Sequence, residues 1–202
     1  NLAWGAHAQA HAQMWRISDD FWDEWQLLLD QFGRLEKWNA FRRAGAWPDA
    51  DMLPLGRLRM GQGDTRFTRD EQQTLMTLWS IARSPLIMGG DLRSMDDATH
   101  RLLTNAEVIA VNQHSTANQP LWRDAQRAVW RAQSGGGDRI YVALFNLSDR
   151  PVPIDQPLKA LAAPDQARVR DIWTGQEATI RGALSVELRP HACAFYSIAA
   201  TA

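Results

Sequence analysis

The spacing of apolar residues changes near residue 115, and this change limits the possible folds more than any other feature. Before it, apolar side chains recur every three or four residues, as on one face of an amphipathic helix. Beyond it, they alternate with polar residues or form short runs between turn residues, as in β-strands. We therefore predict two domains, residues 1–114 and 115–202, joined by a polar connector near 113–119.

The first domain is expected to alternate helices with short extended segments. A capping box of Thr68 and Glu71 marks the start of one helix, and Pro85 limits its end. Strands that alternate with helices are typical of parallel βα units. The predicted helices cover residues 20–38, 68–82 and 96–104, and the predicted extended segments cover 14–18, 52–55 and 86–88.

The size of the first domain limits what these βα units can form. A closed (β/α)₈ barrel takes about 250 residues, so residues 1–114 can supply only its C-terminal half. Half a barrel leaves open sheet edges, which tend to pair with another strand. We expect the missing N-terminal half barrel to come from the same gene or another chain, or the half barrel to self-associate.

The second domain shows a strand pattern with turn signals such as Gly135–Asp138 and Thr174-Gly175. Short strands at this spacing predict a small antiparallel β-sandwich. The expected fold class is therefore α/β plus all-β: the C-terminal half of a (β/α)₈ TIM barrel followed by a small antiparallel β-sandwich domain. The predicted strands cover residues 128–132, 139–146, 168–173, 184–188 and 193–198.

Composition excludes several classes of partner. The formal net charge is −1 with no basic stripe, so we expect no nucleic acid. No apolar stretch is long enough to cross a bilayer, and no signal peptide is visible at the start, so we expect no membrane partner. The single cysteine, Cys193, lies in an apolar run and predicts a buried thiol. These features leave the compartment open.

Acidic residues cluster after the first predicted strand, together with Arg16. The end of a barrel strand lies on the active-site face, and a carboxylate beside tryptophan rings there would be desolvated, which raises its pKa for general acid chemistry. The alternative is that Asp19 or Asp20 caps the following helix, with Asp23 and Glu24 near its positive end. Residue chemistry alone leaves both interpretations open.

A second acidic pair, Asp49 and Asp51, follows Trp47-Pro48. Its carboxylates could hold sugar hydroxyls, or could make the local hydrogen bonds of a polar turn. The ten tryptophans carry a similar ambiguity, because indole rings fill cores and also stack on the flat apolar faces of sugars.

Metal and cofactor chemistry find little support in the sequence. His7 and His11 lie four residues apart, but no further ligand nearby completes a metal site, so a solvated helix face is the favoured interpretation. Gly135–Gly137 lacks the residues of a phosphate-binding loop, and no nucleophile elbow is found. We therefore expect no metal and no cofactor.

Four sequence blocks in this order and spacing resemble glycoside hydrolase family 27, which contains α-galactosidases and α-N-acetylgalactosaminidases. The residues of these blocks are most similar to those of bacterial members. The resemblance covers residues 14–113 well, and the remainder as the C-terminal antiparallel β domain of the family. The blocks are MWRISDDFWD at 14–23, WPDADML at 47–53, LWSIARSPLI at 78–87 and LLTNAEVIAVNQ at 102–113.

The resemblance implies a (β/α)₈ barrel and a retaining double displacement. Asp20, four residues after the arginine of the first block, matches the acid/base aspartate of the family. Arg16 matches the arginine that contacts a sugar hydroxyl. Asp51 and Met52 match residues that line the sugar site, with Asp49 in a supporting position.

The chain departs from the family pattern at the nucleophile. The Lys-x-Asp motif that supplies it does not occur in the sequence, and neither does the segment that selects the sugar. We expect a retaining exo-glycosidase for terminal α-linked galactose-like sugars of an α-galactoside or related oligosaccharide, inactive as this chain alone. The alternative is a non-catalytic carbohydrate-binding or structural remnant. N-acetylgalactosamine and arabinopyranose remain open as substrate sugars.

Overall fold

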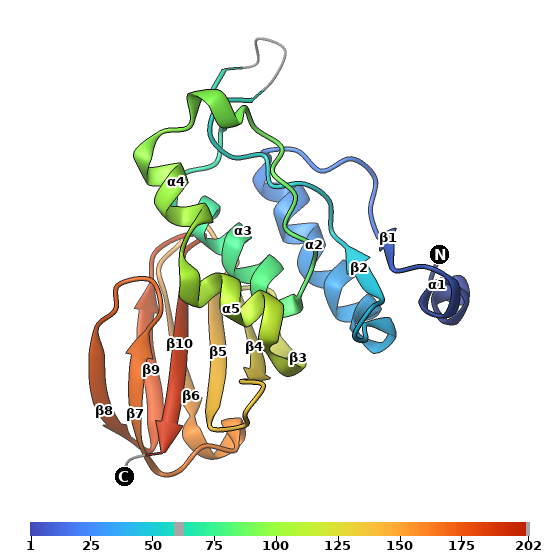
Figure 1. Ribbon diagram of the computed structural model, residues 1–202. Helices are drawn as coiled ribbons and strands as arrows, with labels where there is room; N and C mark the ends of the chain where they lie inside the picture. The colour runs from blue at the N-terminus through green and yellow to red at the C-terminus, as the bar shows by residue number, and fades with distance from the viewer. Residues whose placement is uncertain (59–62, 201–202) are drawn as a thin grey trace. The chain divides into compact units, whose positions relative to one another are not determined.

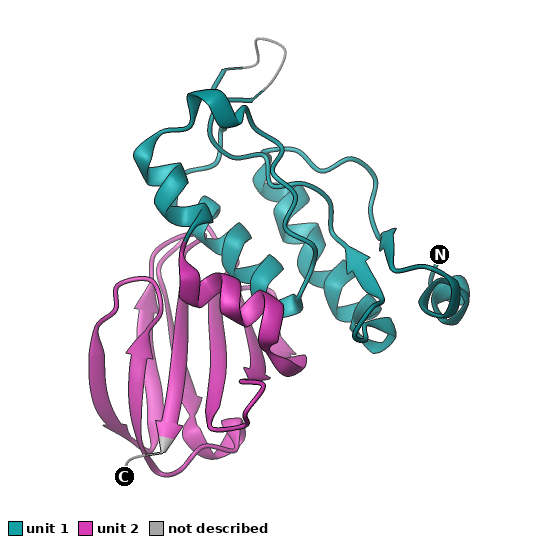
Figure 2. Ribbon diagram, in the orientation of Figure 1, with its two compact units in different colours: residues 1–104 teal, residues 105–202 magenta. Residues whose placement is uncertain are grey.

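The computed structural model describes residues 1–58 and 63–200 and divides the chain into two compact units (Figure 2). Unit 1 is Asn1–Thr104 and unit 2 begins at Asn105. The division lies ten residues before the predicted boundary at 114, because helix α5 (Ala106–His114) belongs with the β-strands that follow it. Glu107 of α5 forms an ion pair with Arg170 at 2.7 Å.

Unit 1 alternates helices with short parallel strands (Figure 1). Strand β1 pairs with β2 in parallel, from Met14↔Trp47 to Arg16↔Asp49. A further parallel bridge joins Leu53 to Met88. This is the alternation expected of barrel βα units. The elements are η1 (Leu2–Trp4), α1 (Gly5–His11), β1 (Met14–Arg16), α2 (Trp25–Trp38), η2 (Asn39–Phe41), β2 (Trp47–Asp49), α3 (Arg69–Ala82), η3 (Leu92–Ser94) and α4 (Asp97–Leu103).

Two elements of unit 1 differ from the prediction. Helix α2 begins at Trp25, not at residue 20, because the backbone N–H of Phe21 donates instead to the side chain of Asp51. The second strand lies at Trp47–Asp49, whereas the predicted segment 52–55 makes one isolated bridge. Both differences depend on contacts between residues distant in sequence, which local apolar spacing does not encode.

Helix α3 starts at the predicted capping box. Thr68 Oγ1 accepts a hydrogen bond from the Glu71 N–H, and Glu71 Oε2 accepts one from the Thr68 N–H at 2.7 Å. The helix ends at Ala82, and Arg83 takes a left-handed conformation with φ 58°. Every residue from Thr74 to Ala82 is buried. The helix is therefore a central packing element of unit 1.

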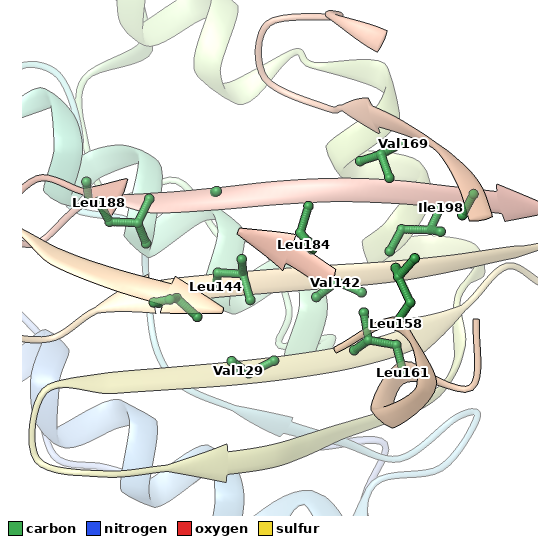
Figure 3. Close-up of a cluster of buried hydrophobic side chains, with 13 residues drawn as sticks. Val129, Val142, Leu144, Leu158, Leu161, Val169, Leu184, Leu188 and Ile198 are labelled. Atoms are coloured by element: carbon green, nitrogen blue, oxygen red, sulfur yellow. The ribbon is translucent and has the colours of Figure 1, made fainter. Parts of the chain in front are cut away.

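Unit 2 contains a six-stranded antiparallel sheet in the order β3-β4-β5-β10-β7-β8, and an antiparallel pair β6-β9. Leu184 and Leu188 of β9 belong to the same apolar cluster as Val142 and Leu144 of β5 (Figure 3). The strands are β3 (Thr116–Arg123), β4 (Arg127–Gln133), β5 (Arg139–Asn146), β6 (Val152–Pro157), β7 (Gln166–Asp171), β8 (Glu177–Arg181), β9 (Ala183–Leu188) and β10 (Cys193–Ala200), with η4 (Leu158–Leu161) after β6.

The five predicted strands of this unit are present, and Cys193 is buried as expected. The predicted polar connector at 113–119 is wrong, because α5 runs to His114 and β3 begins at Thr116. Strand β3 lies at an edge of the sheet and exposes many of its side chains, so its composition is that of a loop. The edge strand β8 was not predicted for the same reason.

The capping box supports a stability prediction. Thr68→Ala should lower the free energy of unfolding by about 1 kcal/mol, because the Glu71 N–H loses its acceptor at the start of α3. Thr68→Ser keeps the hydroxyl and should lose much less. Urea unfolding of the three proteins, followed by circular dichroism, measures both effects. Equal losses in the two variants would show that the hydroxyl contributes nothing.

Candidate active site

The ends of β1 and β2 bring the predicted polar site residues together. Arg16 is the last residue of β1, and its Nη2 lies 2.6 Å from Asp51 Oδ2 and 3.7 Å from Asp20 Oδ1. Asp49 is the last residue of β2. Because parallel strands end at the same edge, these groups share the face on which barrel enzymes carry their active sites.

Asp51 is the most heavily bonded residue of this group. Its Oδ2 accepts the Phe21 N–H at 2.7 Å in addition to Arg16. Its own N–H donates to Asp49 Oδ1 at 2.9 Å, and its carbonyl oxygen accepts the Trp79 indole N–H at 2.9 Å. These bonds hold both the backbone and the carboxylate of Asp51.

The backbone of Asp51 is strained. Its φ is 82°, a left-handed value that a residue with a side chain adopts at a cost of about 1–3 kcal/mol. Such strain persists only where the surroundings fix the conformation, and the bonds from Asp49 and Trp79 act directly on this peptide. Trp79 lies in the predicted helix 68–82, but helical spacing does not reveal what an indole N–H binds.

Asp49 is buried, with 3% of its surface exposed. Burial raises the pKa of its carboxyl above the ordinary value, and the hydrogen bond from the Asp51 N–H and the charge of Arg16 oppose this shift only in part. A nearly solvent-free carboxylate that binds a neighbouring peptide is a structural support for Asp51. Its role as a supporting residue of a sugar site stays a prediction.

Asp20 differs from expectation in its surroundings. Its side chain is 85% exposed, so the desolvation expected from neighbouring tryptophan rings is not found among the described residues. The helix-cap alternative is also wrong, because the N-cap of α2 is Glu24 and neither Asp19 nor Asp20 occupies the cap. The Asp20 carboxylate is therefore accessible, with Arg16 as its ion-pair partner.

Met52 is partly buried beside Gly89. A Cβ atom at Gly89 would lie 2.5 Å from the Met52 sulfur, so a larger residue there would displace the Met52 side chain. Gly89 directly follows the third predicted extended segment, 86–88. The sequence identified Met52 but contained no signal for its closeness to Gly89.

Residues 1–58 and 63–200 contain neither a candidate metal site nor a candidate membrane-spanning helix. No group of three or more His, Cys, Asp and Glu side chains there could hold a metal ion. The rings of His7 and His11 lie 4.6 Å apart on α1 without a third ligand. Within the same residues, no helix combines the length and the apolar character needed to cross a bilayer.

Comparison with known proteins identifies the family. The family model described as alpha galactosidase A matches residues 6–114, and the model described as the alpha galactosidase C-terminal beta sandwich domain matches residues 124–198. The chain belongs to glycoside hydrolase family 27. The predicted fold class, βα units of a (β/α)₈ barrel followed by an antiparallel β-sandwich domain, is thereby confirmed.

Curated relatives of this family-27 chain are α-galactosidases. Alpha-galactosidase 2 of Arabidopsis thaliana is 32% identical over 91% of this chain and 46% of its own length. The α-galactosidase of Cyamopsis tetragonoloba is 30% identical over 94% of this chain and 45% of its own length. The chain thus spans about half the length of the curated relatives it matches.

Solved structures of the family are similar over nearly the whole chain. A β-L-arabinopyranosidase from Geobacillus stearothermophilus, in complex with arabinose, has a TM-score of 0.96 and 38% identity, and the match covers 100% of this chain and 48% of that one. A protein from Bacillus halodurans, described as a putative alpha-N-acetylgalactosaminidase, has a TM-score of 0.84 and 36% identity over 92% and 46% of the two chains.

The raised pKa of Asp49 predicts a pH-dependent stability difference. A carboxyl whose pKa is raised on folding contributes stability below its ordinary pKa of 3.8, and loses it as the pH rises through the folded value. Asp49→Asn stays neutral and keeps an acceptor oxygen for the Asp51 N–H. Its stability relative to wild type should therefore increase from about pH 3 to pH 7, measured by urea unfolding.

Asp91→Asn is the control of opposite sign. Hydrogen bonds from Arg93 lower the pKa of Asp91 to about 2, so its charged form stabilises the fold above that value. This variant should lose stability relative to wild type as the pH rises from about 2 to 4. A stability difference for Asp49→Asn that is flat with pH, beside a sloping one for Asp91→Asn, would contradict the prediction.

Proposed function

We propose that this chain supplies the acid/base half of a retaining exo-glycosidase of α-galactosidase type. In this proposal, residues 1–114 form the last βα units of the catalytic barrel and residues 115–202 form the C-terminal β domain. The substrate is an α-galactoside or related oligosaccharide with a terminal α-linked galactose-like sugar. The observation that carries the proposal is the ion pair of Arg16 and Asp51 at the strand ends, with Asp20 beside Arg16.

The proposed roles follow from the positions of the side chains. Asp20 protonates the glycosidic oxygen as it leaves and then takes a proton from the attacking water. Both steps need an accessible carboxyl, which the 85% exposed side chain of Asp20 provides. Arg16 and Asp51 bind hydroxyls of the sugar with fixed polar groups, and Met52 contributes an apolar contact. Asp49 fixes the Asp51 peptide by accepting a hydrogen bond from its N–H.

The nucleophile has to come from outside the printed sequence. A retaining mechanism needs a second carboxyl about 5–5.5 Å from the first, across the glycosidic bond. The sequence holds two lysines, Lys37 and Lys159, and neither is followed two residues later by aspartate. We propose that the N-terminal half barrel, from the same gene or another chain, supplies the nucleophile and completes the site; self-association of this half barrel would cover its open sheet edge but would bring no Lys-x-Asp motif.

The edge of β1 supports such a partner. Within the described residues, β1 pairs with β2 and with no second strand, so its outer edge offers unpaired backbone groups. Met14, the first residue of β1, is 50% exposed. An added strand would satisfy the backbone groups and cover this side chain.

A second substrate sugar is favoured by one finding. The β-L-arabinopyranosidase structures are 38% and 40% identical to this chain, against 30–33% for the plant α-galactosidases. β-L-Arabinopyranose has the ring hydroxyls of α-D-galactopyranose but lacks the exocyclic hydroxymethyl group. The Arg16–Asp51 pair, if it binds ring hydroxyls, suits either sugar.

The acid/base role predicts a large kinetic effect. In the assembled enzyme, Asp20→Asn should lower the rate on substrates with poor leaving groups by about 10²–10⁴-fold, because proton donation to the leaving oxygen is lost. Asp19→Asn is the matched control and should leave the rate near wild type. Initial rates on an alkyl α-galactoside measure both. An unimpaired Asp20→Asn enzyme would contradict the role, and turnover of an aryl α-galactoside by this chain alone would contradict the need for a partner.

The choice of sugar is tested with a substrate panel. We expect the assembled enzyme to cleave aryl α-D-galactoside or aryl β-L-arabinopyranoside, with aryl α-N-acetylgalactosaminide as the third sugar compared. Arg16→Lys should lower kcat/KM on every accepted sugar, because it removes the guanidinium Nη2 that donates to Asp51 Oδ2. Binding of these sugars without cleavage of any would instead support a non-catalytic carbohydrate-binding module.

A further inference from the structure

Gln31 is a polar residue in the apolar face of α2. Its side chain is fully buried, and it lies at helical spacing between Leu28, Phe32 and Leu35, which are buried as well. Burial of an amide group costs free energy unless its hydrogen bonds are made. A leucine at this position would continue the apolar face without that cost, so the contacts of Gln31 indicate why an amide is present.

The Gln31 amide joins the two loops at the strand ends. Its Nε2 donates to Ser18 Oγ at 2.9 Å, in the loop after β1, and to the Ala50 carbonyl at 3.3 Å, directly after β2. A carbonyl oxygen can only accept, so the Ala50 contact fixes which end of the amide faces the loops. The Gln31 Oε1 is buried and has no partner among the residues that the structure describes. The side chain therefore bonds to the loops that carry Asp20 and Asp51.

The Ala50 end of this link is fixed independently of α2. The Ala50 N–H donates to Ser84 Oγ at 3.0 Å. The peptide that follows is held by Asp49 Oδ1 and by the indole of Trp79, as described above. Ala50 therefore serves as the fixed end, and loss of the bond from Gln31 leaves its position supported.

The Ser18 end has fewer contacts. The N–H of Ile17 donates to the carbonyl at the end of β2 at 3.0 Å. Within the described part of the chain, no backbone N–H of residues 18–20 donates to another backbone carbonyl. The bond from Gln31 to Ser18 therefore anchors a segment that backbone pairing does not hold.

We propose that Gln31 is a positioning residue for the acid/base chemistry, which holds Ser18, and through it Asp20, in place relative to the peptide of Asp51. The inference rests on the proposed function, because it takes Asp20 as the acid. Asp20 is two residues after Ser18, so their Cα atoms are at most about 7 Å apart and a shift of Ser18 reaches Asp20. A misplacement of about 1 Å at a catalytic group can lower a rate by about 100-fold.

The test compares two galactosides that differ in their need for an acid. A dinitrophenolate departs as a stable anion, whereas an alkoxide needs a proton as it leaves. In the assembled enzyme, Gln31→Leu should lower kcat/KM on an alkyl α-galactoside by about 10- to 100-fold and leave kcat/KM on dinitrophenyl α-galactoside near wild type. A role in holding the sugar-binding groups would instead lower both values equally.

Ser18 variants test the same link from its other end. Ser18→Ala should give the same selective loss, and the double variant with Gln31→Leu should lose little more, because both substitutions break one interaction. Ser18→Thr keeps the hydroxyl and should keep most of the rate on the alkyl galactoside. The Ser18 variants decide the question even if Gln31→Leu fails to fold.

Gln156→Leu is the matched control, because it removes another buried glutamine. Gln156 lies in β6 of unit 2, is 2% exposed, and accepts the Trp122 indole N–H at 2.8 Å. This variant should lower the urea midpoint of unfolding and change neither rate. Equal losses on both galactosides in Gln31→Leu and Ser18→Ala, or no loss on the alkyl galactoside, would overturn the inference and leave the proposed function intact. Absence of hydrolysis by the wild-type assembled enzyme would overturn both.

Discussion

The conformation of Asp51 is the constraint on which the rest of the site depends. Its left-handed backbone turns the chain at the end of β2, so that its carboxylate meets Arg16 and the Phe21 N–H. The Phe21 bond keeps the preceding loop out of the helix and leaves Asp20 in an accessible position. Without this one peptide conformation, the polar residues of β1 and β2 would not meet in this arrangement.

Burial separates the roles of three carboxylates in this network. Asp49 is enclosed and binds a backbone N–H, which suits a supporting group. Asp51 is mostly covered, and its carboxylate is held by Arg16 and the Phe21 N–H. Asp20 is open to solvent, which is compatible with the acid/base role proposed for it. The same residue type thus takes different tasks according to its surroundings.

The sequence predicted those parts of the fold that local patterns encode. The capping box at Thr68 and the apolar run of β5 depend on neighbours in the chain, and both were found where expected. The start of α2 and the course of β3 depend on distant partners, and both were predicted wrongly. In the site, family resemblance indicated Arg16 and Asp51 by position, but only the structure connects them to Trp79, because an indole hydrogen bond leaves no periodic signal.

The short strands of unit 1 are too weak to hold this site by themselves. β1 and β2 share three residue pairs, and a two-stranded pairing is marginal in water. Additional support comes from the helices: Gln31 of α2 donates to Ser18 Oγ at 2.9 Å and to the Ala50 carbonyl at 3.3 Å, and Trp79 of α3 binds the next peptide. Both side chains are fully buried, so these bonds form away from competing water. Hydrogen bonds from α2 and α3 therefore position the loops that carry the proposed chemistry. These bonds lie within unit 1 and do not require the neighbouring strands of a closed barrel.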